Sequence, residues 1–142
     1  DVYKRQALCQ QLHRYQATLR TCFTLENFDN LIKNGRMRPI VGTLLRSLGI
    51  HIIADATAEG TIHVADKARG VGKTYRAITA LMKASKDCTD AEVVISHCEN
   101  LEGAMALKRQ ILADLPVKQV DLLSCRGLTS FYAMEKGLIV GY

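Results

Sequence analysis

Aromatic side chains are scarce in this sequence of 142 residues: there are five tyrosines, three phenylalanines and no tryptophan, 6% in all. Proteins that bind single-stranded nucleic acid stack bases on aromatic side chains placed among basic ones, and that combination is sparse here. The two prolines, Pro39 and Pro116, both suit the start of a secondary-structure element. No apolar run approaches the roughly 20 residues that a membrane-spanning helix needs, and the mixed, charged N-terminus does not resemble a signal peptide.

The cysteines form no motif. None belongs to a Cys-x-x-Cys pair, their number is odd, and they are scattered along the chain: Cys9, Cys22, Cys88, Cys98 and Cys125. This pattern does not match a disulfide framework or a structural zinc site. We therefore expect reduced thiols in a cytoplasmic protein, with no metal site and no cofactor. No Ser–His–Asp arrangement and no pair of catalytic carboxylates is recognisable either.

The composition is that of a globular domain. Hydrophobic residues make up 48% of the chain and charged residues 23%, a balance typical of folded proteins. A chain of this length is expected to form one domain and to bury roughly two-thirds of the surface of its unfolded form. The net charge of +5 permits an anionic partner and does not by itself indicate nucleic acid.

Hydrophobic periodicity predicts an α/β fold in which helices pack on a mixed sheet. The second half of the chain alternates apolar strands with amphipathic helices, and a hairpin over 50–66 adds antiparallel strands. The expected helices cover 7–20, a segment ending at 34, a segment starting at 39, and 70–86, 100–112 and 127–133. The expected strands cover 21–24, 50–55, 61–66, 92–97, 117–124 and 137–141.

Two of these helices carry patterns that predict their buried side. In the first helix the apolar residues Leu8, Leu12, Tyr15 and Leu19 form a stripe with helical spacing. In the helix over 100–112, we expect the core-facing side chains to be Leu101, Met105 and Ile111.

A turn that carries arginines follows the second predicted helix. Thr24 or Asn27 is suited to cap the start of that helix. Gly35 is suited to end it, because glycine accepts a positive φ without a Cβ clash. A rigid turn of this kind is suited to docking an anion or an acidic partner. The arginines gathered around it and around the next helix are Arg36, Arg38 and Arg46.

A basic stretch that contains glycine opens the helix over 70–86. The stretch KARGVGKT, 67–74, is similar to a phosphate-binding P-loop, but Lys67 stands where the first glycine of that motif is required. Free N–H groups and the dipole at a helix N-terminus favour anions. Arg69 and Lys73 are therefore candidates for binding an anionic ligand or partner, and a solvated basic helix start is the alternative.

Polar residues at two further element ends complete the candidate site. His97 ends a buried strand, where it is either a ligand contact or a hydrogen-bonded structural residue. His97 and Cys98 cannot act as a nucleophile and base together, because neighbouring strand residues point to opposite faces. Thr129 and Ser130 offer hydroxyl groups to a carboxylate, or Thr129 caps the helix over 127–133.

Several of these segments, in this order, resemble the second domain of DegV-family proteins. LIKNGRM at 31–37 is similar to the family's LxxGGRI turn, and KARGVGK at 67–73 is similar to its KxRGxxKA loop. ISHCEN at 95–100 resembles the family's IxHxxN strand end, and GLIVG at 137–141 also occurs there. The chain departs from the family at RGLTSFYA, 126–133, where many members have an HxGPG loop that helps to bind the ligand's head group.

The resemblance implies a lipid-binding carrier and not an enzyme. The family resembles bacterial proteins of phospholipid metabolism that hold a long-chain fatty acid and present it to a fatty acid kinase. The implied partners are that fatty acid, the kinase and, through the basic charge, an anionic membrane surface, but not nucleic acid. A basic α/β interaction or nucleic-acid-binding module without catalysis is the alternative. The implied ligand- or partner-binding residues are Arg36, Arg69, Lys73, His97, Thr129 and Ser130.

The first six residues, DVYKRQ, resemble the in-frame translation of a transposase sequencing adapter. We therefore expect residues 7–142 to form the DegV-like C-terminal domain, in a fragment from which the family's N-terminal domain is absent. A native N-terminus with this sequence is the alternative.

Overall fold

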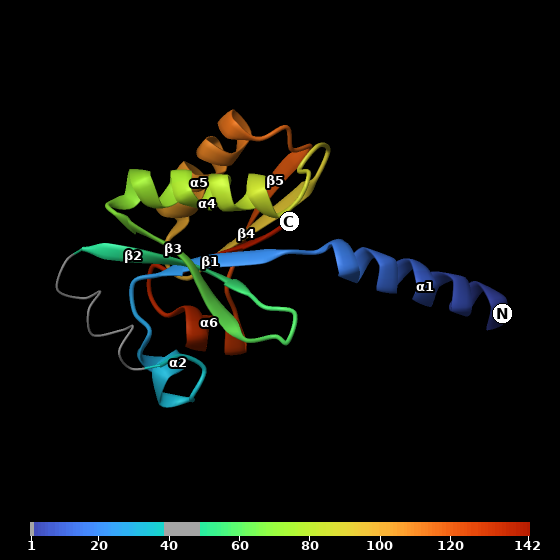
Figure 1. Cartoon of the computed structure of the whole chain (residues 1–142), viewed down its shortest axis with the longest axis horizontal. Helices are drawn as coiled ribbons and strands as arrows, with labels where there is room; N and C mark the ends of the chain where they lie inside the picture. Colours follow the sequence, from blue (N-terminus) through green and yellow to red (C-terminus); the bar gives the residue numbers. More distant parts are fainter. Residues whose placement is uncertain (1, 39–48) are drawn as a thin grey trace.

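A six-stranded mixed sheet organises the fold (Figure 1). The structure is a computed structural model that describes residues 2–38 and 49–142. The strands lie in the order β3-β2-β1-β6-β4-β5; β4 and β5 are parallel, and the other neighbours in this order are antiparallel. The strands are β1 (Thr21–Leu25), β2 (Ile50–Ala56), β3 (Ile62–Arg69), β4 (Glu92–His97), β5 (Gln119–Ser124) and β6 (Leu138–Gly141).

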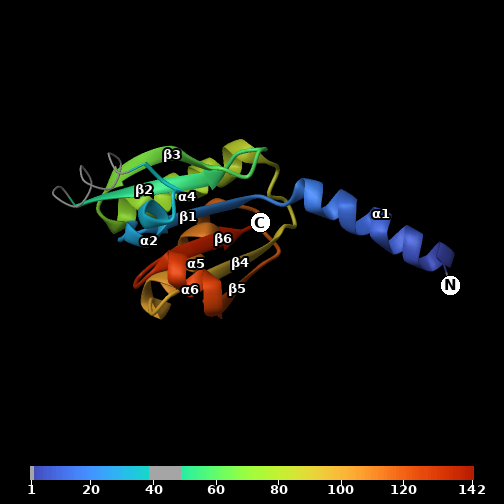
Figure 2. The same cartoon turned by 90° about the horizontal axis from the view of Figure 1, so that it is seen from below.

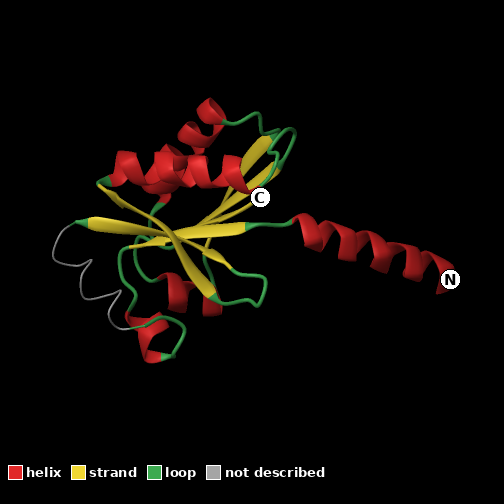
Figure 3. Cartoon of the chain, viewed as in Figure 1, coloured by secondary structure: helices red, strands yellow, loops and turns green. Residues whose placement is uncertain are grey.

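Helices cover both faces of this sheet (Figures 1 and 2). The long helices α4 (Val71–Ser85) and α5 (Leu101–Asp114) lie together on one face, and the short helices α2 (Asp29–Lys33) and α6 (Gly127–Ala133) lie on the other. Helix α1 (Val2–Thr18) extends away from the sheet and covers neither face (Figure 3). The mixed sheet with packed helices confirms the predicted fold class.

Strand alternation divides the core into two clusters. Successive side chains of a strand point to opposite faces, so Cys22 of β1 contacts the cluster under α4 and α5, whereas Phe23 and Leu25 contact the cluster under α2 and α6. The first cluster is centred on fully buried residues such as Ile53, Ile78, Met82, Val93, Ile95, Leu107, Ile111, Leu138 and Val140. The second consists of Leu25, Phe28, Leu31, Met37, Ile52, Ala54 and Ala133.

Gly35 ends α2 as the sequence predicts. Its φ is +68°, and its N–H donates to the carbonyl of Ile32 at 3.0 Å while the N–H of Arg36 donates to the carbonyl of Leu31 at 2.8 Å. These two bonds and the positive φ make a Schellman motif. The turn therefore fixes the backbone of Arg36.

The predicted start of α2 is partly wrong. Thr24 and Leu25 belong to β1, where Thr24 pairs with Ile53 and with Leu138. Asn27 is not the N-cap either, since Phe28 holds that position; Asn27 lies one residue earlier, where its Oδ1 accepts a hydrogen bond of 2.8 Å from the N–H of Asp29. Pairing with two neighbouring strands outweighs the local capping tendency of Thr24.

The predicted buried stripe of α1 is wrong, and the predicted buried face of α5 is correct only for Ile111. The apolar stripe of α1 is exposed, with Leu8 at 56% and Tyr15 at 58% exposure, and none of the residues of α1 is buried. In α5, Leu101 and Met105 are exposed, and the buried side chains are Ala104, Leu107 and Ile111. These three also follow helical spacing, so the sheet selects a neighbouring face of the same helix.

The basic stretch over 67–74 is not a loop. β3 continues to Arg69, and Gly70, with φ of +83°, turns the chain directly into α4. The helix predicted from Pro39, together with Arg46, lies outside the described residues. No helix in the described part of the chain is long and apolar enough to cross a membrane.

Candidate functional site

The face covered by α2 and α6 contains a largely apolar cavity of about 430 Å³. This volume lies within the range of about 300–1,000 Å³ that is typical of small-molecule sites. The two helices on this face are short, with five residues in α2 and seven in α6. Its apolar wall consists of Phe23, Leu25, Leu31, Ile62, Leu128, Tyr132, Ala133 and Ile139.

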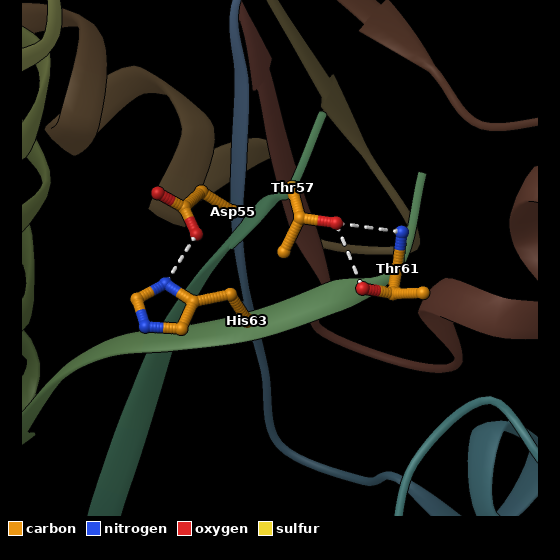
Figure 4. Close-up of polar contacts among 4 residues, drawn as sticks. All are labelled: Asp55, Thr57, Thr61 and His63. Atoms are coloured by element: carbon orange, nitrogen blue, oxygen red, sulfur yellow. Dashed lines mark hydrogen bonds and ion pairs between the residues drawn. The ribbon is translucent and has the colours of Figure 1, made fainter. Parts of the chain in front are cut away.

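Three contacts hold the wall of this cavity in place. Asn30 of α2 donates a hydrogen bond of 2.6 Å from Nδ2 to the carbonyl of Phe131, which joins α2 to α6. The ring of Phe131 packs edge-on against Tyr132, with 5.1 Å between the ring centroids. At the β2–β3 turn, the hydroxyls of Thr57 and Thr61 lie 2.8 Å apart, and Thr57 Oγ1 also accepts from the N–H of Thr61 (Figure 4).

Among the described residues that line the cavity, Arg36 is the charged one. Its side chain is exposed, whereas its backbone is fixed by the Schellman motif. Gly35, Gly60 and Thr61 complete the polar side of the wall. A guanidinium beside an apolar cavity is suited to a ligand with an apolar body and an anionic end, because its planar fork binds a carboxylate through two hydrogen bonds.

A second cavity, of about 310 Å³, lies on the opposite face near the first turns of α4 and α5. Its wall contains side chains of opposite charge. Oε2 of Glu26 lies 3.7 Å from Nζ of Lys136, and Glu102 lines the same cavity. Burial raises the pKa of Tyr75 in this wall, and the charges of Glu26 and Glu102 raise it further. Such a polar wall is less suited to an acyl chain than the cavity between α2 and α6.

The structure does not bring all the predicted site residues together. Arg36 borders the apolar cavity, and Arg69 shares its sheet face, because Arg69 pairs with Ile50, which contacts the cluster under α2 and α6. Thr129 and Ser130 lie on α6, but the residues of α6 that line the cavity are Leu128, Tyr132 and Ala133. The alternative role of Thr129 as the helix cap is wrong, since α6 begins at Gly127.

Lys73 and His97 lie on the other face. Lys73 is exposed in the first turn of α4. His97 is 9% exposed and follows Val93 and Ile95 on the side of β4 that faces α4 and α5. The N–H of Asn100 donates to its Nδ1 at 3.4 Å, and the side chain of Asn100 caps α5 by accepting from the N–H of Gly103. This geometry favours the interpretation of His97 as a hydrogen-bonded structural residue.

The apolar lining is what sequence analysis missed. The lining residues come from β1, α2, β3, α6 and β6, so the cavity exists only once the sheet has assembled. The one local signal was the alternation of Phe23 and Leu25 along β1. In the described residues, no group of three or more His, Cys, Asp and Glu side chains is placed to hold a metal ion, and the five thiols are free.

Comparison with known proteins identifies related sequences. A profile of the DegV family, described as an uncharacterised protein family, matches residues 4–138. A DegV domain-containing protein of Streptococcus gordonii is 32% identical over 136 residues, which cover 95% of this chain and 48% of that protein. One from Streptococcus pneumoniae is 34% identical over 129 residues, 90% of this chain and 45% of that protein. The chain spans about half the length of these relatives.

Solved structures give the same result for the fold. A DegV family protein from Eubacterium eligens, loaded with heptadecanoic acid, matches with a TM-score of 0.89 at 26% identity, over 96% of this chain and 49% of that one. The fatty acid kinase (Fak) B3 protein of Streptococcus pneumoniae, loaded with linoleic acid, matches with a TM-score of 0.86 at 32% identity, over 96% of this chain and 48% of that one.

Proposed function

The chain belongs to the DegV family, and on this premise we propose that it binds a long-chain fatty acid and presents the carboxylate to a separate fatty acid kinase. The observation that carries the proposal is the apolar cavity between α2 and α6 with Arg36 in its wall. Two similar structures hold long-chain fatty acids, and one of them is named as part of a fatty acid kinase system.

The cavity is suited to the acyl chain. Each methylene group that leaves water for an apolar site contributes about 0.8 kcal/mol, and the lining offers side chains such as Phe23, Leu31 and Ile139. The chain spans about half the length of its relatives. We propose that the additional half of the full-length protein supplies a second wall and further polar contacts to the head group.

Arg36 is suited to the carboxylate, because the turn that carries it is fixed by backbone hydrogen bonds and its exposed guanidinium can form two hydrogen bonds with one ligand. Removal of the side chain leaves the backbone bonds of the Schellman motif in place. Arg36→Ala is therefore a test of binding with little expected effect on the fold.

The test compares oleate with oleyl alcohol, which has the same chain but no charge. We expect Arg36→Ala to weaken oleate binding about tenfold, or about 1.4 kcal/mol, and to leave the binding of oleyl alcohol unchanged. The matched control is Arg109→Ala, which removes an exposed arginine from α5 on the opposite face. Equal affinity of the wild type for the acid and the alcohol, measured by isothermal titration, would contradict a role for Arg36 in binding the carboxylate.

We assign the contact with the kinase to a second residue, Arg69. Arg69 ends β3 immediately before α4, is exposed, and lies on the same sheet face as Arg36. Its position beside a helix N-terminus is unfavourable for a cation, which is explained by an anion or an acidic kinase surface that it meets. Lys73, in the first turn of α4, adds positive charge.

We expect Arg69→Ala to lower kinase-dependent formation of the acyl phosphate at least tenfold, or about 1.4 kcal/mol in the barrier, and Arg69→Lys to restore part of it. Arg109→Ala again serves as the control, and melting curves check the fold. If a folded Arg69→Ala protein supported acyl phosphate formation at the wild-type rate, Arg69 would have no role in the kinase step. The proposal that the cavity binds a fatty acid would be unaffected. Peripheral contact with an anionic membrane, based on the net charge of +5, stays a prediction.

A further inference from the structure

Cys98 and Cys125 occupy matching positions at the ends of two parallel strands. β4 and β5 pair in register as far as His97 and Ser124, and a cysteine follows on each strand. The N–H of Cys125 donates to the carbonyl of His97 at 2.8 Å, which continues the ladder by one residue. The two cysteines are therefore neighbours across the strands.

Both side chains lie on the same side of the sheet. Val93, Ile95 and His97 of β4 point towards α4 and α5, so the next residue, Cys98, points to the other face. Cys98 and Cys125 are both partly buried and both pack against the cluster under α2 and α6. Their sulfur atoms thus share one face, which a bond between them requires.

The spacing is also suitable. Neighbouring strands lie about 4.8 Å apart, and the Cα atoms of a disulfide lie roughly 4.4–6.8 Å apart. The backbone of Cys98 is held on its other side, where its N–H donates to Gly137 at 3.0 Å and its carbonyl accepts from Lys136 at 2.8 Å. The remaining thiols are elsewhere: Cys9 is exposed on α1, and Cys22 and Cys88 are buried in the cluster under α4 and α5.

We propose that Cys98 and Cys125 form a modification site, a dithiol that low-molecular-weight disulfides such as oxidised glutathione convert to an intramolecular disulfide. One protein thiolate attacks the small disulfide, forms a mixed disulfide and releases one small thiolate. The second protein thiolate then attacks the protein sulfur of that bond, and the second small thiol leaves. The protein loses two protons and two electrons, and the small disulfide is reduced to two thiols.

Burial of the thiols slows the first step of this reaction, and their proximity makes the second step intramolecular. Burial raises the pKa of the Cys125 thiol, and the neighbouring Cys98 raises it further, so little thiolate is present near neutral pH. Once a mixed disulfide forms, the second thiol is close and attacks it before another small molecule arrives. The product joins the end of β4 to the segment that leads into α6, whose residues Leu128 and Tyr132 line the apolar cavity.

The experiment treats the folded protein carrying Cys9→Ser with oxidised glutathione and follows the products by intact mass and peptide mapping. The substitution removes the exposed thiol, which otherwise reacts first. We expect the loss of two hydrogen atoms and one cross-linked peptide pair that contains Cys98 and Cys125. The further substitution Cys98→Ser or Cys125→Ser is expected to leave a stable mixed disulfide with glutathione on the remaining partner.

Two outcomes would overturn the proposal. One is a protein that carries glutathione on both Cys98 and Cys125 without a cross-link. The other is a protein in which neither residue reacts after the wild-type Cys9 has been fully modified under the same conditions. Both outcomes are read on protein without substitutions at Cys98 or Cys125, so misfolding of a variant cannot produce them.

Discussion

The two faces of the sheet are built differently. Helices α4 and α5, with 15 and 14 residues, cover one face with a continuous core of fully buried side chains. Helices α2 and α6, with five and seven residues, cover the other and leave a cavity of about 430 Å³. Since a well-packed core contributes most of the stability, we expect the filled face to support the fold, and we propose the face with the cavity as the ligand-binding side.

The comparison is tested most directly by the same substitution on each face. Leu107 is fully buried on the filled face, and Leu128 lines the cavity with 72% exposure. We expect Leu107→Ala to lower the free energy of unfolding by about 3 kcal/mol, because it leaves a void in a packed core. Leu128→Ala should change it by less than about 0.5 kcal/mol and should weaken fatty acid binding. Urea denaturation and a binding titration give both numbers, and equal loss of stability in the two variants would contradict the division of roles.

High pH should weaken the filled face. Burial, together with the smaller effect of the charge of Asp55, raises the pKa of the Cys22 thiol from 9.0 to about 12. Between those pH values the unfolded chain releases this proton while the folded chain retains it, so stability falls as the pH rises, by at most about 1.4 kcal/mol per pH unit. Denaturation curves at pH 8 to 11 should show a shallower decline for Cys22→Ala than for the wild type. If the free energy of unfolding fell equally with pH in both proteins, ionisation of Cys22 would not contribute to the loss of stability.

The turn that carries Arg36 should depend on the backbone of Gly35. The φ of Gly35 is +68°, and a Cβ there would meet no other atom within 4 Å, so the cost of substitution is strain and not collision. Gly35→Val should cost about 1–2 kcal/mol. Gly35→Asn should cost clearly less, because asparagine tolerates this region. Chemical denaturation of the two variants measures the difference, and equal losses would remove the argument for a left-handed cap.

Helix α1, which covers neither face, should contribute least. None of its residues is buried, and a hydrogen bond of 3.1 Å from Nζ of Lys86 to the carbonyl of Thr18 joins its last residue to the rest of the domain. Deletion of residues 2–18 should change the free energy of unfolding by less than about 0.5 kcal/mol. A loss of more than about 1 kcal/mol in thermal or urea unfolding would mean that α1 packs on the domain in solution.

Local signals predicted the elements well and their packing less well. β4 and α6 begin and end at the predicted residues, and the break at Gly35 is where the sequence places it, because apolar runs and glycine act over a few residues. The prediction that Thr24 caps a helix failed because Thr24 pairs with Ile53 and Leu138, which are distant in sequence. The prediction that Leu101 and Met105 face the core failed because two adjacent faces of α5 are apolar. The position of the sheet decides which of these faces is buried.

The candidate site was predictable only where it is local. Arg36 follows from the turn that ends α2. The cavity beside it brings together Phe23, Ile62 and Ile139 from three different strands, and no pattern along the chain connects these residues. The resemblance to the DegV family pointed to a lipid ligand before the cavity was visible, but it did not indicate which side chains form the wall.

The order of the strands has a consequence for how the chain folds. β1 and β6, the first and last strands that the structure describes, lie side by side in the middle of the sheet, and Arg20 and Tyr142 exchange backbone hydrogen bonds of 2.8 and 3.0 Å. Contacts between residues so far apart close large loops and slow folding. During synthesis, β1, β2 and β3 emerge together but have no partner for the open edge of β1 until β6 follows. Since β6 follows the other described strands in the sequence, the half-sheet of β1, β2 and β3 exposes an open edge until β6 is made, and such an edge is prone to pairing with another chain.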